Sequence, residues 1–391
     1  MAMMTTDPAA GPGAARRFAF AIDQSGGNAV YQANLAQALA GVPGVEATYH
    51  GVHIVEDDVW QLVPGVRSNY ALTASARAAA ALHATRRRTG RVDAALIHSQ
   101  SIALFAIPFM RRVPTVISSD GTPKNYDSYA DGLEHVVYGR RVEAFKQHWT
   151  RVAVRSARRL LGFSSWVRDS FVRDYGADPA RVVVIPPGID TSLWVPRPDL
   201  RPNDGIVRIL FTGGNFPRKG GPVLLDWVQR TRHRNVEVHL VTQHPVPAAE
   251  RVVVHNGMRA NSPELVALAQ RCDLFALPTR GDCFSFAGIE AQAVGMPVVI
   301  SNVGGISEII TDGENGYLVG RDDHASFFER LDRLVDDVAL RERMGRLGRE
   351  RAVERFTARR NAARVLALLS EVADEGTGTP AAHPHGDRRA A

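Results

Sequence analysis

The stretch CDLFALPTRGDCFSFAGIEAQAVGMPVVISN, residues 272–302, decides the fold that we expect for this chain. It opens with a short apolar run, passes through a loop containing Gly281 into a helical stretch, and returns to a β-branched run just after Gly295. Glycine often ends a helix because it adopts the left-handed backbone conformation at little cost. A strand, a helix and a second strand in succession are typical of a parallel sheet covered by helices.

The same alternation of short apolar runs and amphipathic stretches extends over most of the chain, which predicts a doubly wound parallel α/β fold. The strands predicted in the first half are 17–23, 94–100, 114–120 and 181–190. Those predicted in the second half are 207–214, 236–242, 250–257, 272–279 and 296–302. Two such sets predict two similar Rossmann-like lobes that face each other across a cleft.

The proline-rich polar segment 196–204 lies between the two sets of strands and marks the expected domain boundary. We therefore predict one domain over 16–195 and a second over 196–355, as the length of 391 residues also favours. The two ends, 1–15 and 376–391, are rich in small and polar residues, and we expect both to be disordered.

Composition excludes several classes of protein. The chain is 45% hydrophobic and 23% charged, and it has no apolar run near the roughly 20 residues of a membrane-spanning helix. The first residues lack the apolar core of a secretory signal, so we expect a cytoplasmic protein. Its two cysteines, Cys272 and Cys283, are too few for a disulfide framework or a four-ligand zinc site.

The net charge of the chain is +6, and basic residues gather in two clusters. One cluster is Arg86 to Arg88, and the second consists of Arg140, Arg141, Arg151, Arg155, Arg158 and Arg159. Solvated helix faces commonly carry such charge, but a phosphate-bearing acceptor or an anionic membrane surface would also use it. The second reading predicts a peripheral position at the inner membrane face. No basic-aromatic nucleic-acid module is present, so nucleic acid is not an expected partner.

Ligands of open parallel sheets bind beyond the carboxyl ends of the strands. Gly26 and Gly27 follow the first predicted strand, where backbone N–H groups can approach an anion at a helix start. A tight turn explains the same two glycines equally well, and they do not form a GxGxxG dinucleotide fingerprint.

The second half opens with a similar loop, FTGGNFPRKGG, residues 211–221. Here Gly213 and Gly214 end a predicted strand and precede Arg218 and Lys219. Adjacent cations in a glycine-framed loop predict a diphosphate site, because they place fixed positive charge against phosphate oxygens. A solvated loop is the alternative.

Two acids bracket the start of the helix in the opening stretch. Asp282 lies in the loop before it, and Glu290 lies about one turn inside it. Glu290 is costly to bury among apolar neighbours unless it is hydrogen-bonded, as vicinal ribose hydroxyls would do. Ser285 is expected to cap the helix, whose positive dipole end then faces the cleft.

Four segments of the chain resemble those of a known family. The segment 282–319 resembles the E-x7-E element and the following glycine-rich block of retaining glycosyltransferases of family 4, which have the GT-B fold. Segment 211–221 is similar to the family's phosphate loop, 184–196 to its PxGvDxxxFxP segment, and 164–182 to the helix and turn before it. The resemblance covers most of 17–370.

The resemblance implies transfer of a sugar from a nucleotide-diphosphate sugar, of the UDP or GDP type, to an acceptor hydroxyl with retained anomeric configuration. It implies that Glu290 binds the ribose hydroxyls and that Asp282 holds hydroxyls of the donor sugar. Arg218 and Lys219 would neutralise the diphosphate without a metal or a cofactor. In the family's front-face mechanism the leaving diphosphate takes the acceptor proton. The helical segment 356–375 would cross back to the first lobe.

Other residues take their expected roles from the same resemblance. Backbone amides near Phe284, Ser285 and Phe286 would position the sugar and phosphate. The loop at Gly26 and Gly27 would close over the phosphates from the other lobe.

The first lobe is expected to hold the acceptor, a small molecule, a glycan or a lipid-linked compound. His98 resembles the histidine that family members place beside the donor sugar, although a strand-end histidine with satisfied nitrogens fits equally well. Asp120 ends the next strand and is the acid expected to orient an acceptor hydroxyl. Asn125, Tyr126 and Asp127 extend the same loop and are further candidates for acceptor contact.

Two positions depart from the family pattern. Asp282 stands where the family has glutamate, and Gly214 stands where it often has arginine after glycine. The alternatives are a nucleotide-sugar epimerase, a sugar phosphorylase of GT-B architecture, and a two-lobed solute-binding protein. The E-x7-E-like helix favours a transferase over the first two, and the third normally carries an export signal.

Overall fold

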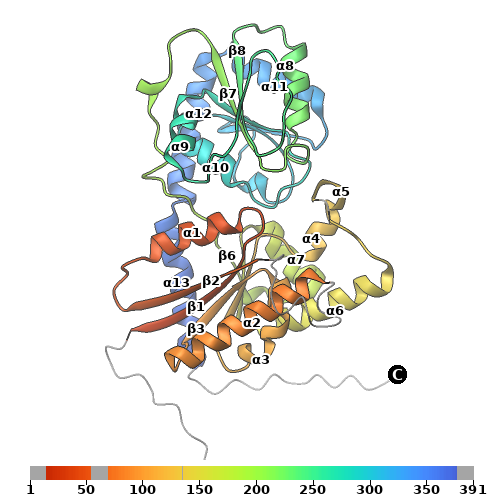
Figure 1. The fold of residues 1–391 in the computed structure, drawn as a ribbon, viewed down its shortest axis with the longest axis vertical. Helices are drawn as coiled ribbons and strands as arrows, with labels where there is room; N and C mark the ends of the chain where they lie inside the picture. Colours follow the sequence, from red (N-terminus) through yellow and green to blue (C-terminus); the bar gives the residue numbers. More distant parts are fainter. Residues whose placement is uncertain (1–14, 54–68, 134, 377–391) are drawn as a thin grey trace, which may run out of the picture.

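The computed structural model describes residues 15–53, 69–133 and 135–376, which form two lobes stacked along the longest axis of the molecule (Figure 1). The ends predicted to be disordered, 1–15 and 376–391, lie almost entirely outside these residues. Each lobe contains one six-stranded sheet in which every strand is parallel to its neighbours. The predicted doubly wound α/β architecture is thus confirmed.

The first sheet has the strand order β2-β1-β3-β4-β5-β6. Its strands are β1 (Arg16–Asp23), β2 (Val45–Val52), β3 (Ala94–His98), β4 (Thr115–Ser119), β5 (Arg159–Gly162) and β6 (Val182–Val184). The helices of this lobe are α1 (Asn28–Leu39), α2 (Tyr70–Thr89), α3 (Ile107–Met110), α4 (Pro123–Ser128), α5 (Ala130–Leu133), α6 (Arg140–Ser156), α7 (Ser165–Tyr175) and α13 (Ala358–Gly376).

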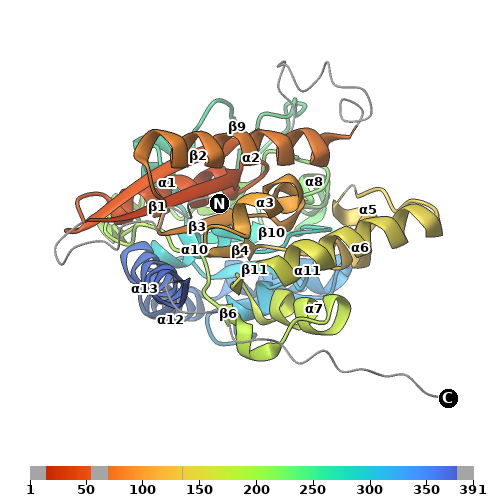
Figure 2. The same cartoon turned by 90° about the horizontal axis from the view of Figure 1, so that it is seen from below.

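Both faces of the first sheet are covered, because side chains alternate along a strand. Phe18 and Phe20 of β1 point to the face packed by α1 and α13, whereas Ala19 and Ala21 point to the face packed by α2, α3, α6 and α7. Figure 2 shows β1 and β3 between α2 above and α13 below, with α6 on the opposite side of the view from α13.

The second sheet has the order β12-β11-β10-β7-β8-β9. Its strands are β7 (Val207–Thr212), β8 (Val236–Val241), β9 (Val252–His255), β10 (Leu274–Leu277), β11 (Val298–Ser301) and β12 (Gly316–Val319). The helices of this lobe are α8 (Gly221–Arg230), α9 (Pro263–Arg271), α10 (Phe286–Ala293), α11 (His324–Asp336) and α12 (Val338–Arg355).

Three strands were not predicted: β2, β5 and β12. β2 is half-exposed along most of its length, so it lacks a continuous apolar signal. β5 begins at Arg159, which we predicted to lie on a basic, solvated helix face. Arg159 instead starts a strand and pairs with Glu371 and Glu375 of α13, so neither it nor Arg158 belongs to the solvated helix face.

Each sheet has one point at which the chain reverses the direction in which strands are added. These points lie between β1 and β3 in the first sheet and between β7 and β10 in the second. Ligands of open α/β sheets bind beyond the carboxyl ends of strands at such points. The loop after Asp23 and the loops after Thr212 and Leu277 are therefore the places where a site is expected.

The chain crosses between the lobes twice, before β7 and again between α12 and α13. The two crossings lie side by side, because Ile189 N donates to the Phe356 carbonyl at 2.8 Å and Ala358 N donates to the Ile189 carbonyl at 2.8 Å. Gly188 permits this approach, since a side chain there would collide with the backbone of Ala358. Beyond the second crossing α13 packs against α1, and Arg16 of β1 pairs with Asp374 at 2.9 Å.

Candidate functional site

A cavity of about 500 Å³ lies between the lobes at the carboxyl ends of the strands just named. Both lobes contribute to its wall. The lining residues are Ser25, Gly26, Gly27, Asn28, Asp120, Tyr126, Leu133 and Phe163 from the first lobe, and Gly214, Asn215, Arg218, Lys219, Asp282, Cys283, Phe284 and Phe286 from the second. Most of the residues that the sequence singled out are therefore brought together in one place.

The loop after β1 forms the first-lobe wall. Gly26 has a positive φ of 55° and lines the cavity together with Gly27, so these two glycines form a tight turn and also face the site. A Cβ on Gly27 would lie 3.0 Å from the Phe286 ring of the other lobe. The glycine thus lets the two lobes approach each other at this point.

Lys219 and Arg218 both contact the loop that carries Asp282. Lys219 Nζ donates to Asp282 Oδ2 at 2.5 Å, and Arg218 Nη1 donates to the Gly281 carbonyl at 2.8 Å. The Lys219 and Asp282 side chains are only 16% and 13% exposed. The alternative of a solvated loop is therefore wrong: the two cations are fixed in the wall of the cavity.

The two glycines before these cations have different positions. Gly214 lines the cavity, whereas Gly213 does not. A Cβ on Gly213 would lie 2.8 Å from Lys219 Cβ, so this glycine allows the lysine to pack closely against the end of β7. Gly213 consequently positions Lys219 and is not itself in the cavity wall.

Helix α10 starts at the edge of the cavity. The Ser285 side chain accepts from Gly288 N at 3.1 Å, which confirms the predicted cap. Ser285 itself does not line the cavity, but its neighbours Phe284 and Phe286 do. The remaining N–H groups of the first turn and the positive end of the helix dipole are thus next to the cavity.

Glu290 is buried in α10, with 7% of its surface exposed. It lies four residues after Phe286 and so on the same face of the helix as this cavity-lining residue. Among the described residues its carboxyl group has no hydrogen-bonding or ion-pair partner, and burial raises its pKa to about 7. Glu290 is not itself in the cavity lining. Its two carboxyl oxygens lie one helix turn after Phe286 and accept no hydrogen bond from the described residues.

Asp120, in the wall of the cavity, interacts electrostatically with two other carboxyl groups. Burial, and the charges of Asp23 and Asp282, raise the pKa of Asp120 to about 7. Asp23 ends β1 and accepts from Ser25 N at 2.7 Å, and burial raises its pKa as well. An acid with a pKa near 7 can hold or release a proton at neutral pH.

The position predicted for His98 beside a donor sugar requires a correction. Its ring is fully buried, stacks on Phe163, and uses both nitrogens within the protein, at 2.8 Å from Ser118 Oγ and 3.0 Å from Asn28 Oδ1. Burial lowers the pKa of His98 to about 3. The structure thus favours the alternative of a satisfied strand-end histidine, which here orients the cavity-lining Asn28.

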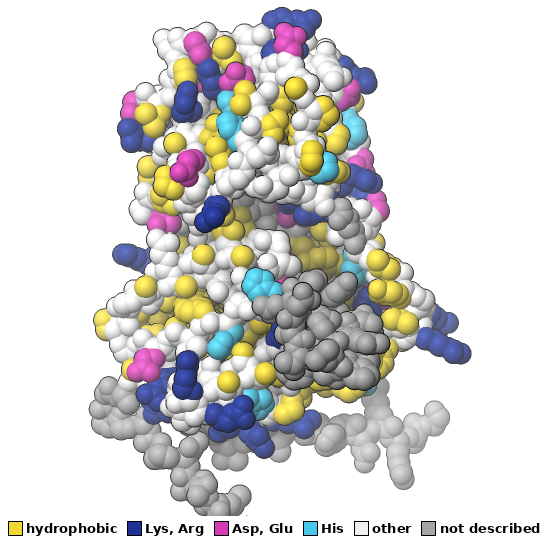
Figure 3. Space-filling view, in the orientation of Figure 1, with side chains coloured by type: hydrophobic (Ala, Val, Ile, Leu, Met, Phe, Trp, Pro, Cys, Tyr) yellow, Lys and Arg dark blue, Asp and Glu magenta, His cyan; other side chains and the backbone are white. Residues whose placement is uncertain are grey.

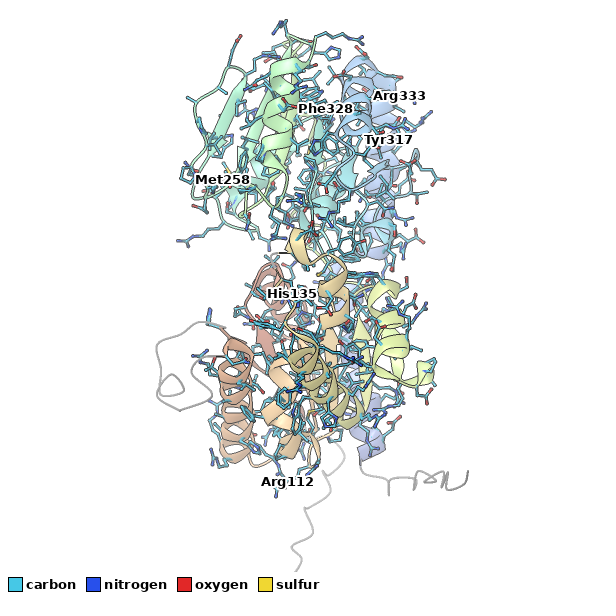
Figure 4. All side chains as sticks on the ribbon, turned by 90° about the vertical axis from the view of Figure 1, so that its right-hand side faces the viewer. Arg112, His135, Met258, Tyr317, Phe328 and Arg333 are labelled. Carbon is cyan, nitrogen blue, oxygen red and sulfur yellow. The ribbon has the colours of Figure 1, made fainter. Side chains whose placement is uncertain are left out.

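Only one of the three candidates for acceptor contact in the loop after β4 lies in the wall of the cavity. Tyr126 lines the cavity. Asn125 instead caps α4 through a reciprocal hydrogen-bond pair with Thr122, and Asp127 pairs with Lys124 at 2.8 Å and with His135 at 3.1 Å. Figure 4 shows His135 near the top of the first lobe, just below the second. Asn125 and Asp127 are therefore engaged in holding the loop.

Several lining residues were missed by the sequence reading. Ser25 and Asn28 lie beside Gly26 and Gly27 in the loop after the first apolar run, and Cys283 directly follows Asp282, so position after a strand was the available signal. Leu133 had no such signal, because it lies in the short helix α5, which reaches the cavity only through the fold.

The lobes also contact each other at the rim of the cavity. Asp131 of α5 pairs with Arg280 at 3.2 Å and also with Arg321. Next to it, Gly132 and Gly281 approach so closely that a side chain on either would collide with the backbone of the other lobe. On a different element, Glu308 Oε1 accepts from the backbone and hydroxyl of Ser165 at 2.6 and 2.7 Å.

Comparison with known proteins identifies both lobes. Residues 25–193 match the family model described as Glycosyltransferase Family 4, and residues 207–337 match the model described as Glycosyl transferases group 1. Together the two models span more than half of the chain.

Two curated relatives are each 33% identical to part of the chain. One is the MMP alpha-(1->4)-mannosyltransferase of Mycolicibacterium hassiacum, over 246 residues, which are 59% of this chain. The other is a D-inositol 3-phosphate glycosyltransferase of Paenarthrobacter aurescens, over 239 residues, which are 56% of this chain. In each case the match spans only 58% of the relative's own length.

Solved structures agree on the fold. Sucrose-phosphate synthase from Thermosynechococcus elongatus superposes with a TM-score of 0.74 at 18% identity, covering 92% of this chain and all of the other. HepE from Anabaena, solved in complex with UDP-glucose, gives a TM-score of 0.66 at 18% identity, covering 91% of this chain and 99% of the other. The chain therefore belongs to the family 4 glycosyltransferases and has their GT-B fold, with two Rossmann-like lobes.

Proposed function

We propose that this chain transfers a glycosyl group from a nucleotide-diphosphate sugar to an acceptor hydroxyl, with retention of configuration and without a metal ion. One observation carries the proposal: the cationic pair of Arg218 and Lys219 is fixed beside Asp282 in a cavity between the lobes. A charged, partly buried lysine and arginine are suited to a diphosphate leaving group, because their charge is desolvated and needs little reorganisation.

The diphosphate would lie against three groups of donors. Arg218 and Lys219 supply charge from one side, and the first N–H groups of α10 supply the positive end of a helix from another. From the first lobe the turn at Gly26 and Gly27 adds backbone N–H groups with no side chain in the way.

The two acids of the E-x7-E-like element divide the rest of the donor between them. Asp282 lines the cavity and would accept from hydroxyls of the transferred sugar. Glu290 has a buried carboxyl without a partner among the described residues, and vicinal ribose hydroxyls would supply the missing donors. The pairing would favour the ionised form of a group that burial otherwise keeps partly protonated.

In the proposed reaction the acceptor oxygen bonds to the anomeric carbon on the face from which the diphosphate departs. The bond between that carbon and the phosphate oxygen breaks, and the acceptor proton passes to the leaving diphosphate. Asp120, on the opposite wall, would orient the acceptor hydroxyl. Inter-lobe contacts at Asp131 and Gly132 would exclude water, which competes as an acceptor.

The donor is proposed to be a UDP- or GDP-sugar, and one of the similar folds was solved with UDP-glucose. No cofactor is proposed. The acceptor is proposed to be a small molecule, a glycan or a lipid-linked compound, bound on the first-lobe side. A cytoplasmic location, with peripheral contact to the inner membrane face through the basic side of the first lobe, is part of the same proposal.

Calorimetric titration with UDP, GDP, ADP and uridine tests the donor site. The proposal expects one nucleoside diphosphate to bind and its nucleoside to bind far more weakly. Incubation with the matching nucleotide sugars and pooled acceptors, read by mass spectrometry, then tests transfer, and proton NMR of the product gives the anomeric configuration. Activity that chelator treatment abolishes and added metal restores would contradict metal independence, and an inverted product would contradict retention.

A further inference from the structure

Helix α6 has an apolar stripe that faces solvent. Val142, Phe145 and Trp149 follow one another at spacings of three and four residues, which places them on one face of α6, and Tyr138 lies just before the helix. All four are exposed, and Phe145 is the most exposed at 61%. Single exposed apolar residues are common, but a periodic row that includes two aromatic rings on one helix is not.

The stripe continues beyond the start of the helix. Val136 and Val137 are also exposed and lie just before Tyr138. The end of α6, in contrast, is anchored, because Ala153 and Val154 are buried in the core of the first lobe. The first turns of α6 therefore project apolar side chains that the lobe does not use for its own packing.

Basic residues flank this stripe on one side. At 100° per residue, Arg141, His148 and Arg155 lie next to it on the helix surface, and Arg140 precedes them at the first position. Among the described residues, Arg140, Arg141 and Arg155 have no ion-pair partner, and all three are exposed. On the other side Lys146 pairs with Glu143 at 2.9 Å, so the one acid of the helix is neutralised.

Figure 3 shows hydrophobic and basic atoms side by side at the edge of the first lobe where the start of α6 lies in Figure 1. This edge follows a cavity-lining segment in the chain. Leu133, which lines the cavity, and His135, which lies just below the second lobe in Figure 4, come directly before the exposed valines in the chain. The exposed valines therefore follow a cavity-lining residue within three positions of the chain.

We propose that the α6 face, defined as Val136, Val137, Tyr138, Val142, Phe145 and Trp149 with Arg140 and Arg141, docks on an anionic phospholipid surface. An amphipathic helix with aromatic residues on one face and arginines at its side matches the interface of such a membrane, where rings enter the headgroup boundary and guanidinium groups meet phosphates. No described helix of the chain is long and apolar enough to cross a membrane. The contact is therefore a surface contact.

Charge argues against a second copy of the chain as the occupant. A two-fold contact places the same patch on both subunits, so it would bring the unpaired arginines of both copies into one interface without an opposite charge. An anionic lipid surface supplies the opposite charge. This inference does not rest on the transfer reaction, because vesicle binding is measured without donor or acceptor and so fails independently of it.

Vesicle flotation of the full chain tests the proposal. The two vesicle types are pure phosphatidylcholine and an equimolar mixture of phosphatidylcholine with phosphatidylglycerol. We expect the wild type to bind the mixed vesicles at least about tenfold more tightly than the neutral ones, and to bind them less as salt increases. V142S/F145S and R140Q/R141Q should each reduce binding by about tenfold or more.

Two matched controls separate this surface from general hydrophobicity and charge. V338S/V353S removes exposed valines from α12, and R87Q/R88Q removes exposed arginines from the other basic cluster. Both should bind vesicles like the wild type. Circular dichroism and the melting temperature check that each variant is folded.

A second measurement reports the contact directly. Brominated lipids in the mixed vesicles should quench tryptophan fluorescence, and Trp149→Phe should remove most of this quenching while binding remains. Equal binding of all variants, wild-type protein that stays in solution, or quenching unchanged by Trp149→Phe would overturn the proposal. So would a dimer that V142S/F145S dissociates in a protein that ignores vesicles, since it would assign the surface to a second copy.

Discussion

Lys219 Nζ lies 2.5 Å from Asp282 Oδ2, so the cation proposed for the diphosphate and the acid proposed for the sugar neutralise each other. A diphosphate must compete with Asp282 for the same ammonium group, or be bridged to it. The pair thus couples binding of the leaving group to placement of the sugar, and it makes the two roles separable by mutation.

Asp282→Asn should affect binding and turnover in opposite directions. Without the carboxylate, Lys219 is free to contact the diphosphate, and affinity for the nucleoside diphosphate should rise by roughly threefold to tenfold. Turnover should fall by about tenfold or more, because a sugar contact is lost. Titration calorimetry and initial rates measure the two effects. Weaker diphosphate binding would show that Asp282 does not compete for Lys219.

Lys219→Ala is the complementary change. It should weaken binding of the nucleoside diphosphate by about tenfold to a hundredfold, because one charge-assisted contact is removed. Affinity for the nucleoside alone should not change, which provides an internal control. If both ligands lose affinity equally, the lysine supports the fold of the cavity and not the diphosphate.

Glu290→Gln should lower donor affinity and turnover without damaging the fold. The amide keeps the shape of the side chain but accepts hydrogen bonds at only one atom, so two ribose hydroxyls are no longer satisfied and affinity should drop by about tenfold. Glu290→Ala should lower donor affinity further than Glu290→Gln does. Donor KM and the melting temperature are the measurements, and the exposed Glu314→Gln is the control. An unchanged KM would remove Glu290 from the donor site.

Stability should depend on pH through the two acids whose pKa values are raised. The pKa of Glu290 is raised from 4.5 to about 7 and that of Asp120 from 3.8 to about 7 by burial. Between about pH 4 and pH 7 the folded state thus holds more protons than the unfolded state, and these groups remove stability as pH rises through that window.

Glu290→Gln and Asp120→Asn should therefore gain free energy of unfolding relative to the wild type as pH rises, by on the order of 1–3 kcal/mol at pH 8 compared with pH 4. Urea denaturation at a series of pH values measures the difference. Glu314→Gln should show no such trend. A difference that stays constant with pH would mean that the two carboxyl groups are not protonated in the folded protein below pH 7.

Gly132→Ala tests whether closure of the lobes matters for turnover. A methyl group there would collide with the backbone of Arg280 and Gly281, so the lobes should be held apart and turnover should fall by about tenfold or more. The control is Gly139→Ala, where a Cβ meets open space and the backbone is extended at φ −61°. Initial rates and the radius of gyration in solution are measured, and normal values for both would refute the role of this contact.

The sequence predicted the architecture because the buried strands of both sheets are continuous apolar runs. It missed β2 and β5 for definable reasons: β2 is half-exposed, and Arg159 of β5 reads as part of a basic helix until Glu371 and Glu375 are brought to it from more than 200 residues away. A pairing of that separation leaves no local pattern.

In the candidate site, too, local sequence patterns predicted some residues, whereas contacts between distant segments determine the others. Lys219, Asp282 and the Ser285 cap follow from short local patterns, and Lys219 and Asp282 line the cavity. His98 was misplaced because a strand-end histidine looks the same whether its ring faces a ligand or the core, and only Phe163 and Asn28 decide between them. Leu133 was not predicted, because its contact with the cavity is made by tertiary packing alone.

Because α13 completes the packing of the first lobe after the chain has passed through the second, the second lobe is topologically an insert within the first. On the ribosome the second lobe can therefore finish folding while the first still lacks one wall of its core. The first lobe has to wait for the final helix, and until then the face of its sheet beside α1 stays open to other apolar surfaces.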